Sequence, residues 1–447
     1  MSGRILILDP SCAAAHGHHL TSLLDLIAAL KPRIPELAVN AAMPPAAFPD
    51  GVVVRTPFTT TVYDEPGLGP RPNGRIERRV WKLRRTLHGL QAATGQAALA
   101  LSAPVSLAAA RRAQDWGWSR WRIKWPTLEA ILRESAGAPC NPAASGSAAP
   151  AGNPVPVAHI VVPSSDAALI CGLAELRAGI PALHEARIHA RLITLTPELA
   201  LLAARGASAR YRALVAQRMQ GVHLYVETPA MQRHVAETFG LDSDVYPYLL
   251  APQPLAPPPA PRDRFAFGYF GATRNEKGFP RLLPILREVA ALRNATDPAL
   301  SFFVHASDAT GSEADILRAA FARIAAPGLD IAFTAGPLSG AAYASHFAAI
   351  DATLLPYTGA RYGLSGSGIL CEAVAYGKAV IYARGLSFAD FCTSDTAIAA
   401  ATDGEFAAAI LVMARAAPRF RAGAAAHAVA YALDVTASPL LRRLTLP

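Results

Sequence analysis

The chain has 447 residues, of which 52% are hydrophobic and 17% are charged. This length accommodates two domains of about 200 residues each, and the apolar content supplies two cores and excludes a globally disordered chain. Five cysteines are scattered without CxxC spacing, which predicts reduced thiols and no structural metal. No apolar run reaches membrane-spanning length, and the first one is too short for a signal peptide, so we expect a cytoplasmic protein.

The formal net charge of +9 is concentrated in one segment. Residues 71–133 hold thirteen Lys or Arg and three acidic residues, and residues 116–125 interleave four Trp with three basic residues. Indole rings and guanidinium groups together suit an anionic membrane surface, so a peripheral membrane association is expected through residues 71–133. A satellite core with a solvated basic face is the main alternative. Stacking on single-stranded nucleic acid is a weaker one, and no nucleic-acid partner is expected.

The first half alternates short apolar runs with helical segments. Continuous apolar runs are typical of buried parallel strands, and a long insertion at about 59–156 interrupts them. The expected strands lie at residues 5–8, 37–42, 52–58, 159–163, 192–195 and 222–226.

A Pro-rich linker over residues 251–264 has no place inside a core and divides the chain. We therefore expect an N-terminal domain over 1–250 and a C-terminal domain over 265–415. A helical segment over 416–447 is expected to pack back on the N-terminal domain. Strands of the second half are expected at residues 265–270, 301–305, 331–334, 352–355 and 379–382.

Strand–helix alternation of this kind predicts an α/β protein with two doubly wound, Rossmann-like parallel sheets covered on both faces. Right-handed crossovers place every strand-to-helix loop at one edge of such a sheet, and ligands bind at that edge. Two loops of the second half carry motifs there.

The first motif, GYFGATRNEKG, begins at Gly268 and follows an apolar strand. Gly271 and Gly278 allow a close backbone approach, and Arg274 and Lys277 place two cations beside a helix start, which favours a phosphate. The alternative is a turn with solvated charges.

The second motif is a glycine-rich loop that follows the strand ending at Leu355 and leads into a helix near residue 368. The amides of Ser365, Gly366, Ser367 and Gly368 would form an anion cradle at the helix start. Glu372 lies one turn further on, where a carboxylate suits the two hydroxyls of a ribose. The alternative is an ordinary helix cap with an exposed Glu.

Together the motifs resemble the C-terminal domain of GT-B glycosyltransferases, in particular the large retaining family numbered four. The resemblance covers about residues 265–385 well and the first half only in outline. It implies two Rossmann-like domains that face each other across a cleft, a nucleotide-diphosphate sugar donor, and no metal or cofactor. It also implies that Arg274 and Lys277 hold the diphosphate, that the amides of residues 365–368 contact phosphate or sugar, and that Glu372 binds the ribose.

Two positions depart from the family pattern. Leu364 stands where the family usually has an acid, eight residues before Glu372, and this weakens any assignment of donor-sugar contacts. Ala272 stands where a basic residue usually follows the first glycine, and Arg274 partly compensates for it.

In the N-terminal half, the loop ending in Gly17, His18 and His19 follows the first strand. The resemblance implies that this loop approaches the donor phosphates, with Gly17 at the donor and His18 or His19 taking part in catalysis. Asp166, after the strand at 159–163, is a further catalytic candidate. Its alternative role is a helix N-cap. The closely spaced histidines also resemble a metal tract, but no acidic residue lies nearby and no metal is expected.

The resemblance thus implies a hexosyltransferase-type enzyme that retains the anomeric configuration, and the basic, Trp-rich segment predicts that it works at the inner face of the cytoplasmic membrane. Its acceptor would be a lipid-linked, polysaccharide or lipopolysaccharide-type glycan. Two alternatives stay open: a non-catalytic GT-B scaffold that binds nucleotide or membrane, and a sugar-nucleotide epimerase on the same fold.

Overall fold

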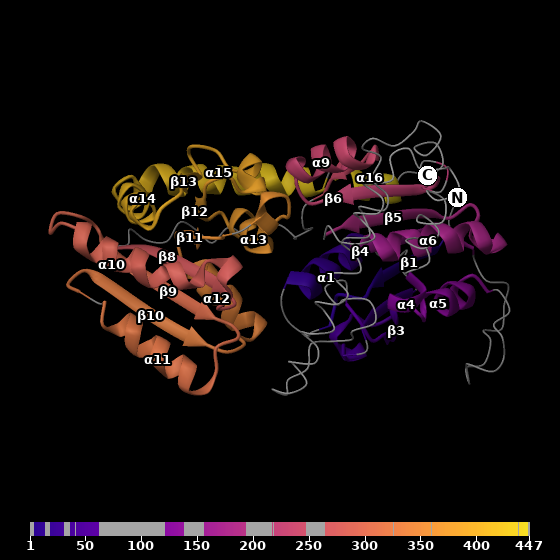
Figure 1. The fold of residues 1–447 in the computed structure, drawn as a ribbon, viewed down its shortest axis with the longest axis horizontal. Helices are drawn as coiled ribbons and strands as arrows, with labels where there is room; N and C mark the ends of the chain where they lie inside the picture. Colours follow the sequence, from indigo (N-terminus) through magenta and orange to yellow (C-terminus); the bar gives the residue numbers. More distant parts are fainter. Residues whose placement is uncertain are drawn as a thin grey trace, which may run out of the picture. The chain divides into compact units, whose positions relative to one another are not determined.

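The chain divides into two compact units (Figure 1). The first comprises Met1–Glu227, Gln232–Tyr246 and Pro439–Pro447, and the second comprises Thr228–Met231 and Pro247–Ser438. The computed structural model describes residues 4–13, 18–30, 36–40, 42–61, 121–137, 156–193, 217, 219–246, 264–324, 326–358, 360–436 and 438–445.

Seven parallel strands form the sheet of the first unit, in the order β3-β2-β1-β4-β5-β6-β7. The strands are β1 Arg4–Asp9, β2 Glu36–Asn40, β3 Val53–Phe58, β4 Val157–Ser165, β5 Arg187–Leu192, β6 Val222–Val226 and β7 Asp244–Val245. The chain winds in one direction from β1 to β3 and in the other from β4 to β7. The loops after β1 and β4 therefore leave the sheet at its topological switch point.

Helices and single 3-10 turns connect these strands. They are α1 His18–Leu30, η1 Pro45–Ala47, α4 Trp121–Lys124, α5 Leu128–Ser135, α6 Ala167–Gly179, η2 Pro181–Leu183 and α9 Pro229–Phe239, whose residues up to Met231 fall in the second unit. A further helix of the first unit, α16 Pro439–Thr445, follows the second unit in the chain. Nine residues of α6 are buried, among them Leu169, Ile170 and Leu173, which makes this helix a core element of the unit.

Six parallel strands form the sheet of the second unit, in the order β10-β9-β8-β11-β12-β13. The strands are β8 Arg264–Gly271, β9 Ala299–Ala306, β10 Leu329–Ala335, β11 Ala352–Leu355, β12 Ala379–Ala383 and β13 Ala397–Ala400. Here the winding direction changes between β8 and β11, so the loops after these two strands start side by side.

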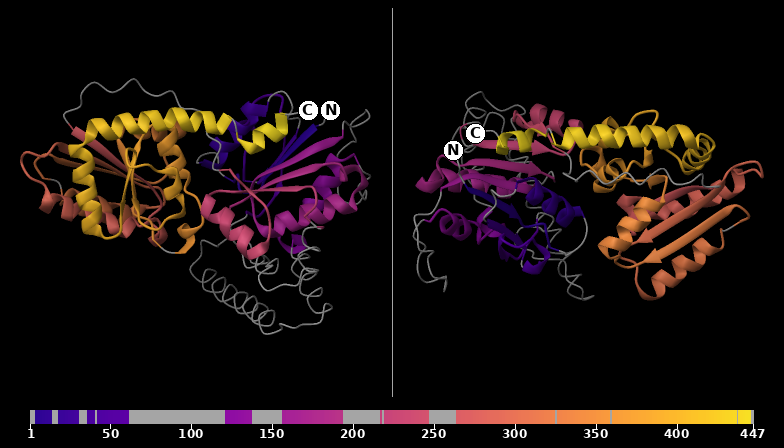
Figure 2. Two further views of the ribbon diagram at one scale, coloured as in Figure 1. Left: turned by 90° about the horizontal axis from the view of Figure 1, so that it is seen from above. Right: turned by 180° about the vertical axis from the view of Figure 1, so that it is seen from behind.

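Alternate side chains of β8 pack on opposite faces of the second sheet. Tyr269 packs against Phe279, just before α10, while Phe270 stacks on Phe347 of α12. Figure 2 shows this sheet with helices on both sides, as expected for a doubly wound fold. The connecting elements are η3 Asn275–Lys277, η4 Phe279–Arg281, α10 Leu282–Leu292, α11 Gly311–Ala322, α12 Gly340–Ala349, η5 Ala360–Gly363, α13 Gly368–Ala375, η6 Ser387–Phe391, α14 Asp403–Arg415 and α15 Ala417–Thr436.

The two doubly wound parallel sheets confirm the predicted α/β class. The strand expected at 192–195 was wrong, because β5 spans Arg187–Leu192. Its buried polar residues His189 and Arg191 hide the apolar pattern. The short strands β7 and β13 were not predicted, since a two-residue strand and an Ala-rich one give no β signal.

Two tryptophans of the basic insertion lie in the core of the first unit. Trp121 and Trp125 are 2% and 1% exposed. The indole N–H of Trp121 donates to Oε2 of Glu175 on α6 at 2.8 Å, and a Cβ atom on Gly172 would lie 2.9 Å from the Trp121 ring. The burial of these two rings agrees with the alternative that the tryptophans form a satellite core. Buried rings are not available to a membrane surface. Most of the insertion, including residues 62–120, lies outside the described residues, as does most of the linker at 251–264.

The last described helix belongs to the first unit, although α15 before it belongs to the second. On α16, Arg443 forms an ion pair with Asp244 of β7, and it donates to the Tyr225 hydroxyl of β6 at 3.2 Å. None of the described helices combines the length and apolar character needed to span a membrane.

Candidate functional site

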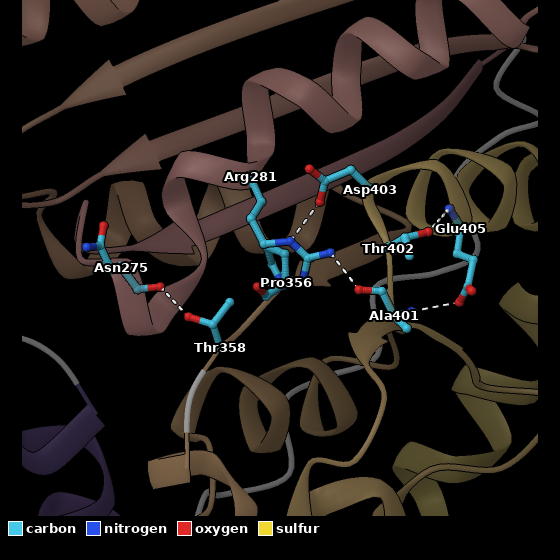
Figure 3. Close-up of polar contacts among 8 residues, drawn as sticks. All are labelled: Asn275, Arg281, Pro356, Thr358, Ala401, Thr402, Asp403 and Glu405. Carbon is cyan, nitrogen blue, oxygen red and sulfur yellow. Dashed lines mark hydrogen bonds and ion pairs between the residues drawn. The ribbon is translucent and has the colours of Figure 1, made fainter.

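Two loops meet at the switch point of the second sheet. The loop after β8 carries the first motif, and the loop after β11 leads into the second. Thr358 joins them, because its N–H donates to the carbonyl of Glu276 at 3.0 Å and its hydroxyl to the carbonyl of Asn275 at 2.7 Å. Figure 3 shows the Thr358–Asn275 contact. The two motifs thus form one loop cluster at the carboxyl edge of the sheet.

Gly278 permits the close approach of these loops. Its φ of 69° lies in the left-handed region, where residues other than glycine are strained. A Cβ atom at this position would also lie 1.8 Å from the carbonyl oxygen of Pro356. The glycine is therefore needed both for its backbone conformation and for its lack of a side chain.

Arg281 holds three strand-end loops together (Figure 3). Its Nε donates to Oδ1 of Asp403 at 2.7 Å, and its two terminal nitrogens donate to the carbonyls of Ala401 at 2.9 Å and Pro356 at 3.4 Å. The guanidinium lies 4.9 Å from the ring centroid of Phe406. This planar group fixes the loops after β8, β11 and β13 in one arrangement. No sequence pattern indicated this role.

Lys277 is linked to Ser367 through one tyrosine. Its Nζ donates to the Tyr357 hydroxyl at 3.0 Å and lies 4.4 Å and 5.1 Å from the ring centroids of Tyr357 and Tyr362. The Tyr357 hydroxyl is 3.2 Å from Oγ of Ser367. Oγ of Ser367 in turn accepts the N–H of Leu370 at 3.3 Å and caps α13. A cation and a helix N-terminus therefore lie within one hydrogen-bond network, as an anion site requires.

The other residues of the two motifs surround this network. Arg274 is half exposed and pairs with Glu276 at 3.1 Å. The carbonyl of Gly271 ends β8 and accepts the N–H of Ser307 at 2.9 Å. The carbonyl of Ser365 accepts the hydroxyl of Ser387 at 2.8 Å. The remaining loop positions, Leu364, Gly366 and Gly368, are partly exposed.

Glu372 is buried one turn into α13, at 8% exposure. The hydroxyl of Tyr343 on α12 donates to its Oε2. Burial raises the pKa of Glu372 to about 7, against the lowering effects of the Tyr343 hydrogen bond and the Lys277 charge. The alternative of an exposed, solvated Glu is therefore excluded. Tyr343 was not identified from the sequence, since it lies 29 residues from Glu372 in the chain.

In the first unit, α1 begins at His18, directly beyond the loop that follows β1 at the switch point. Gly17 and the side chains of His18 and His19 lie outside the described residues. Their assignment to catalysis and to the donor stays a prediction.

Asp166 is buried and fully engaged in structural contacts. Its Oδ1 accepts the N–H of Leu169 at 2.8 Å and caps α6. Its Oδ2 pairs with Nζ of Lys124 at 2.7 Å, and the two side chains are 1% and 3% exposed. The Trp125 indole N–H is 3.4 Å from Oδ1. These contacts favour the capping alternative over a catalytic role.

A second polar group at the carboxyl edge of the first sheet was not identified from the sequence. Asp9 ends β1 and accepts the N–H of Ser11 at 3.1 Å. Burial raises its pKa to about 7, although that hydrogen bond and the charge of Arg191 lower it. Arg191 pairs with Glu227 at 3.4 Å, and both are buried. An Asp directly after an apolar strand was the available signal. No described group of three or more His, Cys, Asp or Glu side chains could hold a metal ion.

The chain is similar in fold to several solved structures. HepE of Anabaena in complex with UDP matches with a TM-score of 0.57 and 13% identity, over 99% of this chain and 100% of that chain. A glycosyltransferase of Rickettsia africae matches with a TM-score of 0.55 and 7% identity, over 99% and 98%. Sucrose-phosphate synthase of Thermosynechococcus elongatus matches with a TM-score of 0.55 and 12% identity, over 99% of each.

No protein-family model matches the chain, and no curated protein does. The structural matches extend over both units, so the chain has the GT-B fold. At this level of identity the likeness shows the fold, and the chemistry has to be argued from the site.

Proposed function

We propose that the protein is a glycosyltransferase that transfers a sugar from a nucleoside-diphosphate donor, whose diphosphate binds at the β8/β11 switch point. The observation that carries this proposal is the network that joins Lys277, Tyr357 and Ser367. The network brings a fixed ammonium to the N-terminus of α13. Both groups favour negative charge, and both would act on the same anion.

The bond to the donor sugar breaks as the diphosphate departs, so charge develops on the leaving group. Lys277, Arg274 and the amides of residues 365–368 would stabilise that charge, because they are positioned before the reaction begins. Glu372 would accept hydrogen bonds from the ribose hydroxyls. The complexes of the Anabaena protein contain UDP or UDP-glucose, which makes uridine donors the first to test.

The acceptor and the stereochemistry follow the expectations from the sequence. The acceptor would be a glycan or a lipid-linked precursor, transfer would retain the anomeric configuration, and His18 or His19 would lie on the acceptor side. The basic insertion would bring the protein to an anionic membrane surface.

Titration calorimetry with UDP tests the binding site. Lys277→Ala should weaken the binding of UDP more than tenfold, because it removes the cation of the network. Arg318→Ala is the matched control, since Arg318 is an exposed cation of α11 that pairs with Asp315 on the same helix. Equal affinity of wild type and Lys277→Ala would remove Lys277 from the site.

A second pair of titrations tests the ribose. Glu372→Ala should lower the affinity for UDP and leave the affinity for pyrophosphate unchanged, since pyrophosphate has no ribose. Equal losses for both ligands would contradict this assignment. Release of UDP from UDP-sugars, with and without glycan acceptors, then tests turnover.

A non-catalytic nucleotide-binding scaffold is the second candidate. Leu364, a partly exposed apolar residue, stands where the resembling family has an acid. UDP binding without donor turnover, with any acceptor tried, would favour the scaffold. An epimerase would instead convert the UDP-sugar without an acceptor.

Deletion of residues 71–133 is not a suitable test of membrane binding, because it also removes the buried Trp121 and Trp125. Replacing the basic residues of 71–85 with Gln retains both tryptophans and removes only positive charge. Reduced flotation with anionic liposomes is the expected result, and unchanged flotation would contradict the proposal.

A further inference from the structure

The carboxylate of Glu372 is held by a tyrosine from a different helix. Tyr343 lies in the first turn of α12 and donates its hydroxyl to Oε2 of Glu372 on α13. One carboxylate oxygen is thereby occupied by the protein. The second oxygen keeps its acceptor capacity for a ligand hydroxyl.

The ring of Tyr343 is fixed by packing, so its hydroxyl has little freedom. Its centroid lies 5.3 Å from that of Phe270 on β8 and 5.6 Å from that of Phe347 on α12. Phe347 in turn lies 5.2 Å from Tyr376, which follows α13. An aromatic cluster built by three elements therefore sets the direction of the Tyr343 hydroxyl.

Several elements of the second unit place charged or titratable groups around Glu372. Lys277 lies on the side of the loop after β8 and lowers the carboxyl pKa. The pKa of Tyr343 itself is raised, by burial first and then by Glu372, Tyr357 and Tyr376. Burial also raises the pKa of Tyr357. The Tyr343 and Tyr357 hydroxyls therefore keep their protons at physiological pH, and the Glu372 carboxyl, with a pKa of about 7, changes charge there.

We propose that Tyr343 is a positioning residue that orients the Glu372 carboxylate toward the donor ribose, and that this buried pair makes donor affinity depend on pH. The inference rests on the proposed function and adds a means of regulation to the same site. The physical reason is that an ionised carboxylate accepts two ribose hydroxyls, whereas a protonated carboxyl loses acceptor strength and is itself a donor.

The direction of the pH effect follows from the burial of Glu372. Its pKa of about 7 lies well above the ordinary value, so a drop in pH from about 8.5 to about 6 protonates most of the population. If only the ionised form binds ribose well, affinity falls about tenfold over that interval. The Tyr343 hydrogen bond lowers the pKa. Removing it therefore shifts the midpoint to higher pH.

UDP-glucose is the probe, because its diphosphate ester has no proton that titrates in this range, unlike the terminal phosphate of UDP. Its dissociation constant is measured across about pH 6 to 9 for wild type, Tyr343→Phe and Glu372→Gln. The Phe variant keeps the aromatic packing and removes only the hydroxyl. We expect a midpoint near neutrality for wild type, a higher midpoint for Tyr343→Phe, and no midpoint for Glu372→Gln.

Two histidines of the second unit are the controls for titration elsewhere. His346 lies on α12 and stacks on Phe303, and His427 lies on α15, which packs on α13. Gln variants of both should keep the wild-type midpoint. A midpoint that moves with either histidine would assign the pH effect to that residue and overturn the inference.

The remaining outcomes separate the two proposals. Failure of wild type to bind UDP-glucose at any pH would overturn the proposed function itself. Binding with a flat pH profile, or with the same midpoint in Tyr343→Phe as in wild type, would overturn this inference and leave the proposed function standing.

Discussion

Gly278 lies so close to Pro356 that a Cβ atom on residue 278 would be 1.8 Å from the proline carbonyl oxygen. The obstacle is backbone and not a flexible side chain, so relief requires the two loops to separate. Gly278→Ala should therefore weaken UDP binding at least tenfold, because Lys277 moves away from Tyr357. The strained backbone adds a stability loss of about 1–3 kcal/mol. Calorimetry and thermal unfolding measure the two effects.

Gly385→Ala is the matched control for this variant. Gly385 has a φ of 83°, and a Cβ atom added to it would meet no other atom within 4 Å, so the alanine brings backbone strain without a collision. This variant should lose stability and keep UDP affinity. A Gly278→Ala protein that also keeps its affinity would show that the loop contact does not position Lys277.

The hydroxyl of Tyr357 should contribute less to anion binding than Lys277 does. Tyr357→Phe removes the hydrogen bonds to Lys277 and Ser367 but keeps the ring over which the ammonium lies. A loss of about 1 kcal/mol corresponds to roughly a fivefold weaker affinity. Pyrophosphate should show the same loss as UDP, because the change concerns the phosphates. A loss of affinity for UDP alone would contradict a role of this network in binding the phosphates.

The buried pair of Lys124 and Asp166 predicts a strongly coupled double-mutant cycle. Lys124→Met leaves a buried carboxylate without its cation and should destabilise the first unit by about 3–5 kcal/mol. Adding Asp166→Asn restores part of this loss, since Asn also caps helices. Urea unfolding followed by Trp fluorescence is the measurement. All five tryptophans lie in residues 81–125, within the first unit. Strictly additive effects would show that the pair is not coupled.

Asp9 should make the first unit less stable as the pH rises. Its folded pKa of about 7 lies above the ordinary value of 3.8, so between these values the folded state binds a proton that the unfolded state has released. Unfolding free energy therefore falls from about pH 4 to about pH 7, by a few kcal/mol. Asp9→Asn, which keeps an oxygen for Ser11, should flatten this slope and exceed wild type in stability at about pH 8.

The control is Asp330→Asn, because the Asp330 side chain is 62% exposed and its neutralisation should leave the slope unchanged. An Asp9→Asn protein with the wild-type slope would show that Asp9 is ionised in the folded state, and would contradict the prediction.

The parts of the fold that could be predicted from the sequence are those with a local physical signal. Continuous apolar runs indicated the strands at 5–8 and 265–270, because such strands are buried on both faces. Gly278 and Lys277 were identified because they lie in the loop that follows an apolar strand. Asp166 was recognised as a possible cap from its place before a helix.

The parts that could not be predicted depend on partners from distant elements. His189 looked incompatible with a buried strand. In the structure its Nε2 is 3.0 Å from His159 and its Nδ1 is 3.1 Å from the Tyr225 hydroxyl, so neighbouring strands satisfy it. Burial lowers its pKa to about 2 and keeps it neutral. Tyr343 and Arg281 were missed for the same reason, since their partners lie far away in the chain.

The ion pair of Arg443 with Asp244 has a consequence for biosynthesis. Asp244 and Tyr225 emerge from the ribosome early, whereas Arg443 follows only after the whole second unit has been translated. The edge of the first sheet near β7 is therefore completed by α16, and this contact forms only after the second unit has been synthesised. A change that removes α16 would act on the unit that was synthesised first.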